Sequence, residues 1–600
     1  MHSCLCSSSI WCKNENLFMM RLLFVFLLVP TFCNALNILL FLIGTNQFER
    51  GIFEFLAQQL ALRHHNVITV KPILIPEEPR LVKPKLHLVR EKTVKNVLPK
   101  SLYEPLEEIA KKLPWEDEYR IDAFDKVYWA AHNASCYKIL NSNLMDTLKQ
   151  ENLDIAIAYG SNPCQLAVTH ILAVPTIYFD LEGLTDETLI ASGSPLDLSY
   201  PPSHCDINEN DHVMMKFMRH SFCYLREYLA QSELPFIASL VSERHRLLDG
   251  PITKMFAEDY TIKKRYNGFP DVDQLKRHSA AFFVNTDPLL EYPRALPPHV
   301  IPVGGLHIDH PKPLFAPWNT TIESAEEGMI IVSLGTQADS GYMTEKQRLA
   351  IADALSKLTK YRIYWRIGPN MNRLLQTTNS LEKDLPKHIN LTTYIPQNDL
   401  LAHKACKLLV TNGGMASIME AVAHGVPIVG IPLYGSNRHN LRKVQYKGLG
   451  VILEKTELSS ASLLKAMKAV LEGSKHKTTA KEMSKEFKSR SESPFAKALH
   501  YIEHIGRHHS NAYLGSRRIE NPLKRFDFYV LIVVLFIPLY IPYKLCSILI
   551  CLLQRQKVGK AKSPSDENES EKFERKRHII SNNNTKSCIN KESKDSSKDK

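Results

Sequence analysis

The stretch 394–440 constrains the fold more than any other part of this chain. Within it, an apolar run at 408–411 leads directly into the turn 412–414, which reads Asn-Gly-Gly, and then into a helical pattern at 415–423. Residues 428–431 again have the character of a buried strand. A strand that turns through glycines into a helix is typical of an α/β unit. It leaves unpaired amides at the helix start, and these amides and the helix dipole attract an anion such as phosphate.

Two glycines before a helix are weak evidence for a phosphate site, because turns also use glycine for its backbone freedom alone. The polar neighbours strengthen the hypothesis. Tyr394 and Gln397 precede the turn with a flat ring and an amide, and Glu420 lies on the second turn of the predicted helix. Together these side chains are suited to hold a base, a ribose and a pyrophosphate.

The stretch resembles the donor-sugar signature of the UDP-glycosyltransferases, the membrane-bound family that includes the UDP-glucuronosyltransferases. It has YIPQ for the family's WLPQ, then NDLLAH, NGG for the family's HGG, and EAVAHGVPIVGIPL nearly letter for letter. A weaker likeness continues through VGGLH at 303–307, VSLGT at 332–336 and WR at 365–366. It covers about residues 36–553 and is strongest in the C-terminal half.

With 600 residues and 44% hydrophobic content, the chain is too long for one hydrophobic core. Apolar strand patterns alternate with helical patterns, which predicts parallel sheets with right-handed crossovers. The strand patterns lie at 37–43, 67–70, 153–158, 174–179, 329–333, 361–367 and 389–392. The resemblance implies the same architecture, the GT-B fold, in which two facing Rossmann-like, doubly wound α/β domains bind ligands beyond the carboxyl ends of their strands. Segments 333–336 and 412–414 are therefore expected to converge.

These patterns, with the resemblance, also predict how the chain is divided. The expected parts are an N-terminal extension with a signal peptide (1–35), an acceptor-binding α/β domain (36–300), a linker (301–320), a UDP-sugar-binding α/β domain (321–515), a transmembrane segment (526–553) and a disordered cytosolic tail (554–600).

Two apolar segments carry the membrane prediction. Arg21 followed by LLFVFLLV is typical of a secretory signal peptide, with a buried strand or a signal anchor as the alternatives. Residues 526–553 are almost wholly apolar and long enough for a tilted span. We therefore expect a single-pass type I membrane protein of the endoplasmic reticulum, with a luminal body and a polar cytosolic tail that cannot fold. Three luminal sequons, at Asn133, Asn319 and Asn390, fit a glycoprotein.

Charge and cysteine usage exclude some partners. The net charge of +12 is spread along the chain without a basic patch interleaved with aromatic residues, which argues against a nucleic-acid-binding protein. No CxxC spacing suggests a metal site, and no cofactor is expected beyond a UDP-sugar as co-substrate. A homo-oligomer remains open. Of the 12 cysteines, five fall in the expected luminal part, where disulfides are permitted, but their pairing does not follow from the sequence.

The resemblance implies a set of donor contacts. Tyr394 takes the place of the tryptophan that stacks on uracil, Gln397 is expected to bond the uracil edge or the ribose, and Glu420 to accept from both ribose hydroxyls. The alternative for Glu420 is a solvated helix residue without a ligand. For Ser333 and Thr336, the alternative is ordinary turn chemistry. The remaining expected donor contacts are Ser333, Thr336, Asn412, Gly413, Gly414, Ser417, Ser436 and Asn437.

Several positions depart from the family pattern. Asn412 replaces a histidine at the diphosphate, and the shorter Ser436 and Asn437 replace the Asp-Gln pair that grips the sugar, so a looser contact or a different sugar is expected. The family's catalytic histidine and its orienting aspartate are replaced by Glu49 and Tyr159. Glu49 is thus the candidate general base, with an ordinary acid in the first turn of a helix as the alternative.

The resemblance and the retained nucleotide contacts favour a hexosyltransferase enzyme. It would transfer a sugar from a UDP-sugar, with inversion, to a hydroxyl of a small lipophilic acceptor. The lost dyad favours a second hypothesis, a catalytically silent relative that acts as a binding or partner protein.

Overall fold

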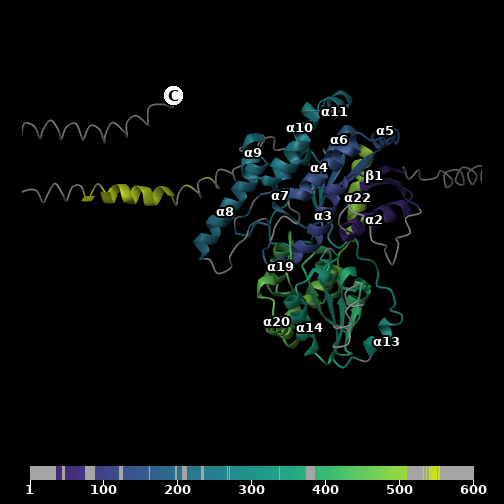
Figure 1. Cartoon of the computed structure of the whole chain (residues 1–600), viewed down its shortest axis with the longest axis vertical. Coiled ribbons are helices and arrows are strands. Elements are labelled where there is room, and N and C mark those ends of the chain that lie inside the picture. The colour runs from purple at the N-terminus through teal and green to yellow at the C-terminus, as the bar shows by residue number, and fades with distance from the viewer. Residues whose placement is uncertain are drawn as a thin grey trace, which may run out of the picture. The chain divides into compact units, whose positions relative to one another are not determined.

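The computed structural model describes most of residues 35–509 and part of the segment that follows (Figure 1). The gaps before residue 510 are 43–46, 75–87, 120–125, 161, 196, 198, 204, 206–211, 232–234, 267, 269–270, 324, 337 and 373–384. After residue 509 it describes 532, 536, 539–550, 552 and 553. The described residues fall into two compact units, one that ends at Ile532 and one that begins after it.

Among its described residues, the N-terminal half is built on a sheet of seven strands. They are all parallel, because each crossover returns the chain to the same end of the sheet before the next strand begins. The order reverses between β1 and β4, which is the switch point of a doubly wound sheet. In spatial order the strands are β3 (Arg90–Val94), β2 (Asn66–Pro72), β1 (Asn37–Phe41), β4 (Ile155–Tyr159), β5 (Thr176–Asp180), β6 (Ala281–Val284) and β7 (Val300–Pro302).

The part of the C-terminal half that the structure describes repeats this plan, with six parallel strands and a switch point between β8 and β11. In spatial order they are β10 (Ile389–Thr392), β9 (Tyr361–Arg366), β8 (Gly328–Ser333), β11 (Cys406–Thr411), β12 (Ile428–Gly430) and β13 (Gly450–Ile452). Two Rossmann-like sheets are the architecture predicted from the alternating strand and helix patterns.

Helices cover both faces of each sheet, as parallel strands buried on two sides require. Those of the N-terminal half are α2 (Gln47–Leu62), α3 (Lys100–Lys112), η1 (Leu113–Trp115), α4 (Lys126–Leu140), α5 (Leu144–Lys149), α6 (Pro163–Ile171), α7 (Asp186–Ala191), α8 (Val213–Ala230), α9 (Pro235–Val241), η2 (His245–Asp249), α10 (Gly250–Glu258), α11 (Tyr260–Arg265) and α12 (Val272–Arg277). Those of the C-terminal half are α13 (Trp318–Glu323), η3 (Ser340–Tyr342), α14 (Glu345–Ser356), α17 (Gln397–Ala402), α18 (Met415–His424), α19 (Asn437–Tyr446), η4 (Lys455–Glu457), α20 (Ser460–Glu472), α21 (Ser474–Lys488) and α22 (Pro494–His508).

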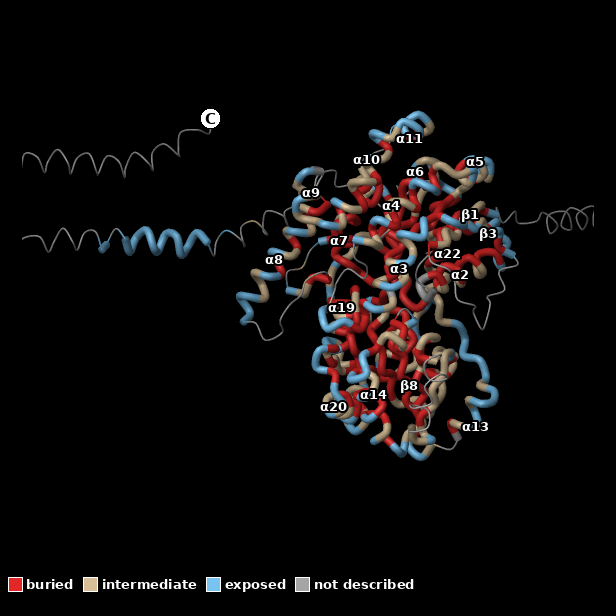
Figure 2. The backbone as a smooth tube through the Cα atoms, in the orientation of Figure 1, coloured by how far each residue is buried: buried red, intermediate tan, exposed pale blue. Residues whose placement is uncertain are grey.

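The buried residues form apolar clusters on either side of the sheets, drawn red in Figure 2. One helix late in the sequence belongs to the N-terminal core. Ala498, Ile502 and Ile505 of α22 pack in the cluster that contains β1 and α2, and Figure 1 shows α22 beside both elements. The chain therefore returns to its first sheet after completing its second.

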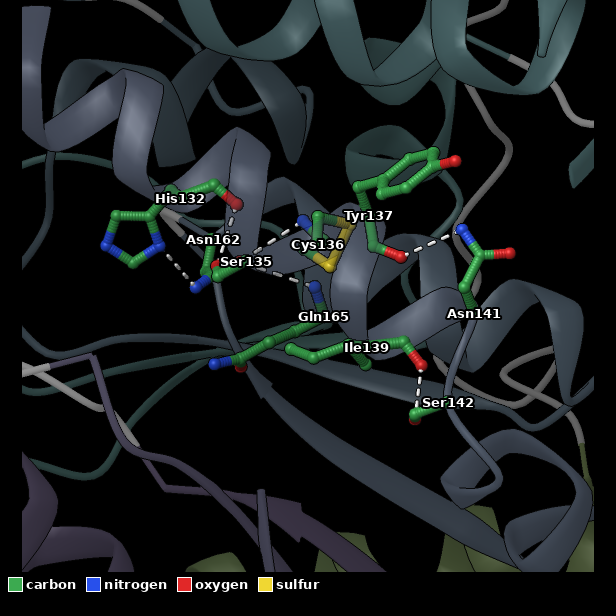
Figure 3. The surroundings of a disulfide bond; sticks show 10 residues. His132, Ser135, Cys136, Tyr137, Ile139, Asn141, Ser142, Asn162 and Gln165 are labelled. Carbon is green, nitrogen blue, oxygen red and sulfur yellow. Dashed lines mark hydrogen bonds between the residues drawn. A yellow bond between two sulfur atoms is a disulfide. The ribbon is translucent and has the colours of Figure 1, made fainter. Parts of the chain in front are cut away.

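The sequence predicted that disulfides are permitted but not how the cysteines pair. Among the described residues, two disulfide bonds form, Cys136–Cys164 and Cys205–Cys223. The first joins α4 to α6 beside His132 and Asn162 (Figure 3). Cys406 is free and its thiol is buried, which raises its pKa to about 12. Two bridges and one free thiol account for the odd number of cysteines in this part of the chain.

The terminal predictions fall largely outside the described residues, which include neither the expected signal peptide nor the expected tail. Of the expected membrane segment, residues 539–550 form a helix with exposed side chains. A search of the described residues finds no helix with both the length and the apolar character that crossing a membrane requires.

Candidate active site

Two strand ends of the C-terminal sheet meet, as the sequence predicts. Ser333 at the end of β8 pairs in register with Thr411 at the end of β11. Beyond them, a Cβ placed on Gly335 would lie only 2.8 Å from Nδ2 of Asn412, so the two loops touch. Gly335 has a φ of +89°, which a side chain would strain. Ser333 is buried and Thr336 is exposed at this edge.

The Asn-Gly-Gly turn leaves the start of α18 open. Oδ1 of Asn412 accepts a hydrogen bond from the Gly414 amide at 3.4 Å, and Gly413 takes a φ of +94°. Among the described residues, no side chain caps the helix at Gly414. The first amides of α18 are therefore available to an anion, with the helix dipole aligned to favour it.

Three predicted donor contacts form one hydrogen-bonded group. Nε2 of Gln397, the first residue of α17, donates to Oε2 of Glu420 at 2.6 Å and to Oγ of Ser417 at 3.0 Å. Both acceptors are on α18, with Glu420 buried and Ser417 half-buried. Tyr394 precedes them in the loop before α17 with 44% of its surface exposed, which leaves its ring open to a stacking partner.

Ser436 and Asn437 lie at the start of α19, against the same turn. A Cβ on Gly413 would lie 2.9 Å from the carbonyl oxygen of Asn437, and Nδ2 of Asn440 donates to the Gly413 carbonyl at 3.4 Å. Asn437 is 5% exposed, and its Nδ2 has no hydrogen-bond partner within the described residues. A buried amide group without a hydrogen-bond partner lowers the stability of the folded chain. A ligand oxygen that accepted a hydrogen bond from it would remove this cost.

The two residues that replace the family's catalytic dyad in this sequence, Glu49 and Tyr159, lie in the N-terminal half. Glu49 lies in the first turn of α2, although its side chain is outside what the structure describes. Tyr159 ends β4, and its hydroxyl donates to Oε1 of Glu182 at 3.2 Å. Asp180 ends β5 and is buried, which raises its pKa to about 6 even though hydroxyls of Thr185 and Thr188 donate to it.

Sequence reasoning missed three residues beside these groups. Nε2 of His307, in the VGGLH segment, lies 3.6 Å from Oε1 of Glu420. Nη1 of Arg366, in the WR pair, donates to the Gly335 carbonyl at 2.9 Å, and burial lowers its pKa. Both short motifs were visible as a family likeness. The third residue, Tyr119, had no sequence signal at all, and its hydroxyl donates to the Gly435 carbonyl at 2.7 Å.

Two other features of the described residues lie apart from this chemistry. A cavity of about 530 Å³ beside β10 is lined by Trp318, Tyr364 and Asn390 among others, and by none of the predicted donor contacts. His245, Asp249 and Asp273 cluster closely enough to suggest metal ligands, but Nζ of Lys276 lies 3.0 Å from Asp249 and 3.3 Å from Asp273. The lysine ammonium thus balances the carboxylates as an internal ion-pair network.

Comparison with known proteins decides the family. Residues 56–560 match the family described as "UDP-glucoronosyl and UDP-glucosyl transferase". The chain belongs to this family. The donor signature in the sequence had predicted this membership.

Curated relatives agree at low identity. The chain is 27% identical over 380 residues to UDP-glucuronosyltransferase 1A3 of Homo sapiens, covering 63% of this chain and 65% of the relative. It is 28% identical over 378 residues to human 2-hydroxyacylsphingosine 1-beta-galactosyltransferase, covering 62% and 63%. UDP-glucuronosyltransferase 3A1 of Xenopus laevis is 30% identical over 410 residues, with 67% and 71% covered. The match thus spans less than two thirds of the length of the two human relatives.

A solved structure supports the fold of this UDP-glycosyltransferase. The glycotransferase of kitacinnamycin superposes with a TM-score of 0.52 over 78% of this chain and 99% of its own, at 13% identity. An identity this low supports the GT-B architecture alone. Its agreement with the two parallel sheets confirms the predicted fold class for the body of the chain.

Proposed function

We propose that this UDP-glycosyltransferase transfers a sugar from a UDP-sugar to a hydroxyl of a small lipophilic acceptor, with inversion at the anomeric carbon. The observation that carries the proposal is the open start of α18 beside the Gln397–Glu420 pair. This arrangement supplies amides for a diphosphate and a carboxylate for a ribose within two turns of one helix.

Each donor contact has a part in this reaction. Tyr394 stacks on the uracil, Gln397 and Glu420 bind the uridine, and Ser333, Thr336, Asn412, Gly413, Gly414 and Ser417 surround the diphosphate. When the bond between the sugar and the phosphate breaks, the amides at the start of α18 stabilise the negative charge of the departing UDP. Ser436 and Asn437 meet the transferred sugar. Glu49 stays the sequence-based candidate for the base that takes the proton of the acceptor hydroxyl.

The identity of the sugar depends on the start of α19. The relatives' names include both glucuronosyl and galactosyl transfer. Because Ser436 and Asn437 are shorter than the pair they replace, we expect a sugar that fills more of this space or is held by fewer contacts. A panel of UDP-glucuronic acid, UDP-glucose and UDP-galactose with mixed phenols distinguishes these possibilities.

Calorimetry with UDP tests the site itself. We expect UDP to bind the purified full chain and Glu420→Ala to weaken its affinity by about 10- to 100-fold, because a hydrogen bond to a charged group contributes roughly 1.5–3 kcal/mol. Glu482→Gln, an exposed glutamate on α21, is the matched control and should bind as wild type does. No heat of UDP binding to the folded wild-type chain would refute the site.

The alternative, a catalytically silent partner protein, is not favoured by family membership. It predicts measurable UDP affinity without turnover for any donor of the panel. The transfer hypothesis predicts turnover for at least one donor.

For the location, we propose a single-pass type I protein of the endoplasmic reticulum membrane with a luminal body. The support is the signal-like segment at 21–35 and the apolar segment 526–553. In sealed microsomes, protease should remove only the tail after residue 553 and leave the body intact. Digestion of the body would refute this topology.

A further inference from the structure

A carboxylate that the sequence did not single out lies where the two halves of the chain touch. Glu182 follows β5, one residue before Gly183. A Cβ placed on Gly183 would lie 2.9 Å from Cε of Met415, the first residue of α18, and 3.5 Å from Oδ1 of Asn440. Glu182 is therefore next to the helix start that we propose for the diphosphate.

The same contact is visible in the packing of the core. Ala416, the second residue of α18, belongs to the buried cluster that contains Tyr159 and Leu181 of the N-terminal half. The segment that carries Glu182 and the first turn of α18 are thus held against each other by apolar contacts.

Other carboxylates at this edge of the N-terminal sheet are occupied by fixed partners. Asp180 accepts from Thr185 at 2.7 Å and from Thr188 at 2.5 Å. Glu291 pairs with Nζ of Lys443 at 2.5 Å. A carboxylate whose oxygens are held in this way is poorly placed to take a proton from a substrate.

Glu182 is different. It is half-buried, and within the described residues no lysine, arginine or histidine pairs with it. Its Oε1 accepts from the Tyr159 hydroxyl at 3.2 Å, and its own amide donates to Oδ1 of Asp180 at 3.1 Å. The tyrosine replaces the orienting aspartate of the family pattern. The carboxylate is therefore oriented through one oxygen, while the rest of the group remains partly open.

We propose that Glu182 is the general base of the transfer and that Tyr159 positions it. This inference rests on the proposed function. The Glu182 carboxylate takes the proton from the acceptor hydroxyl as that oxygen forms its bond to the anomeric carbon. The bond from that carbon to the phosphate oxygen breaks, and its electron pair leaves with UDP. The products are the glycoside, UDP and protonated Glu182, so atoms and charge balance.

Glu49 is the competing residue, and its position is less suited to the role. It lies in the first turn of α2, where the helix dipole favours the anion and so weakens its attraction for a proton. Glu182 lies in the loop between β5 and α7, outside any helix.

The test compares isosteric variants of the full chain. Glu182→Gln should lower kcat by about 10²- to 10⁴-fold, the usual contribution of a general base, while calorimetry shows UDP affinity within about twofold of wild type. Formate should restore part of the turnover of Glu182→Ala, because it supplies a carboxylate in the vacated space. Tyr159→Phe should lower kcat by about 10-fold without changing the donor KM, because only the orienting hydrogen bond is lost.

Glu151→Gln is the matched control. Glu151 is a half-buried glutamate that precedes β4 at the opposite end of the sheet, where it pairs with Arg90 and Lys92. It should keep wild-type kcat. Turnover of Glu182→Gln within about threefold of wild type, or a larger loss in Glu49→Gln than in Glu182→Gln, would overturn the assignment of the base alone. A wild-type chain that binds UDP but transfers no sugar would overturn the proposed function and the base together.

Discussion

In the N-terminal half, burial and one or two polar neighbours shift the pKa of individual side chains. His132 on α4 is 4% exposed, and its burial, with a smaller repulsion from Arg244, lowers its pKa to about 3. Its Nδ1 lies 3.2 Å from Nδ2 of Asn162, which donates to a neutral ring (Figure 3). The imidazole is therefore held neutral in the folded chain, beside the disulfide between α4 and α6.

This burial predicts a pH dependence of stability. Below pH 6.5 the unfolded chain gains a proton at His132 that the folded chain refuses until about pH 3, so the free energy of unfolding falls as the pH falls through this window. Between pH 6.5 and pH 4, the free energy of unfolding of His132→Gln should fall by about 3 kcal/mol less than that of wild type. Chemical denaturation at several pH values measures this difference.

Asp180 changes the pH dependence of stability in the opposite direction to His132. Its folded pKa of about 6 exceeds its ordinary value of 3.8, so between these values the folded chain keeps a proton that the unfolded chain releases. Its contribution therefore declines as the pH rises. Wild type and His132→Gln both contain Asp180, so its contribution cancels when their pH dependences of stability are compared. The difference between the two curves therefore measures the contribution of His132. An unchanged slope in the variant would show that His132 is protonated in the folded chain.

At the scale of elements, a short segment of the N-terminal half is built into the C-terminal half. Nε1 of Trp115 in η1 donates to the Asp339 carbonyl at 2.7 Å, and Trp115 packs in the apolar cluster of the second sheet. The hydroxyl of Tyr119 donates to the Gly435 carbonyl at 2.7 Å and accepts from the Arg438 amide at 2.9 Å. It thereby holds both sides of the turn that carries Ser436 and Asn437.

Removing that hydroxyl tests the role of the segment. Tyr119→Phe leaves a carbonyl and an amide without their partner, so the free energy of unfolding should fall by about 1–3 kcal/mol. The KM for the UDP-sugar should rise in the same variant, because the turn that carries the proposed sugar contacts loses its support. Tyr260→Phe, at a tyrosine that is 77% exposed on α11, should change neither quantity. Equal stability of Tyr119→Phe and wild type in denaturant titrations would contradict this expectation.

At the scale of the whole molecule, a buried ion pair links the two halves. Lys443 on α19 is fully buried, and its Nζ lies 2.5 Å from Oε1 of Glu291, which also accepts from the Thr286 hydroxyl at 2.7 Å. Burial lowers the pKa of Lys443, and Glu291 opposes this effect. Each buried charge is tolerated because it is paired with the other. Since the two partners belong to different halves, the pair depends on the halves staying together.

A pair of variants measures this dependence. Lys443→Met leaves the Glu291 carboxylate buried without its cation, so the free energy of unfolding should fall by about 3–5 kcal/mol. Adding Glu291→Leu removes the stranded charge and should recover most of that loss. Denaturant titration of both variants checks the prediction. A double variant as unstable as Lys443→Met would mean that packing, and not charge, dominates at this position.

Much of the architecture was predictable because buried strands and amphipathic helices leave periodic patterns. The strand at 389–392 matches β10 residue for residue, and the helix expected at 415–423 extends by one residue in α18. The edge strand β3 was missed, because its sequence REKTV is mostly polar and lacks an apolar run. Strands β6 and β7, each four residues or fewer, were also too short to stand out.

The sequence by itself determined the α/β alternation, the Asn-Gly-Gly turn and the choice of candidate donor contacts on α17 and α18, since strand, turn and helix patterns are local and these candidates lie in one short stretch. Only the tertiary structure placed Tyr119 on Gly435, Lys443 on Glu291 and Tyr159 on Glu182. Side chains that meet across loops or between sheets leave no periodic signal along the chain. Their contacts depend on how the packed layers bring distant strand ends together.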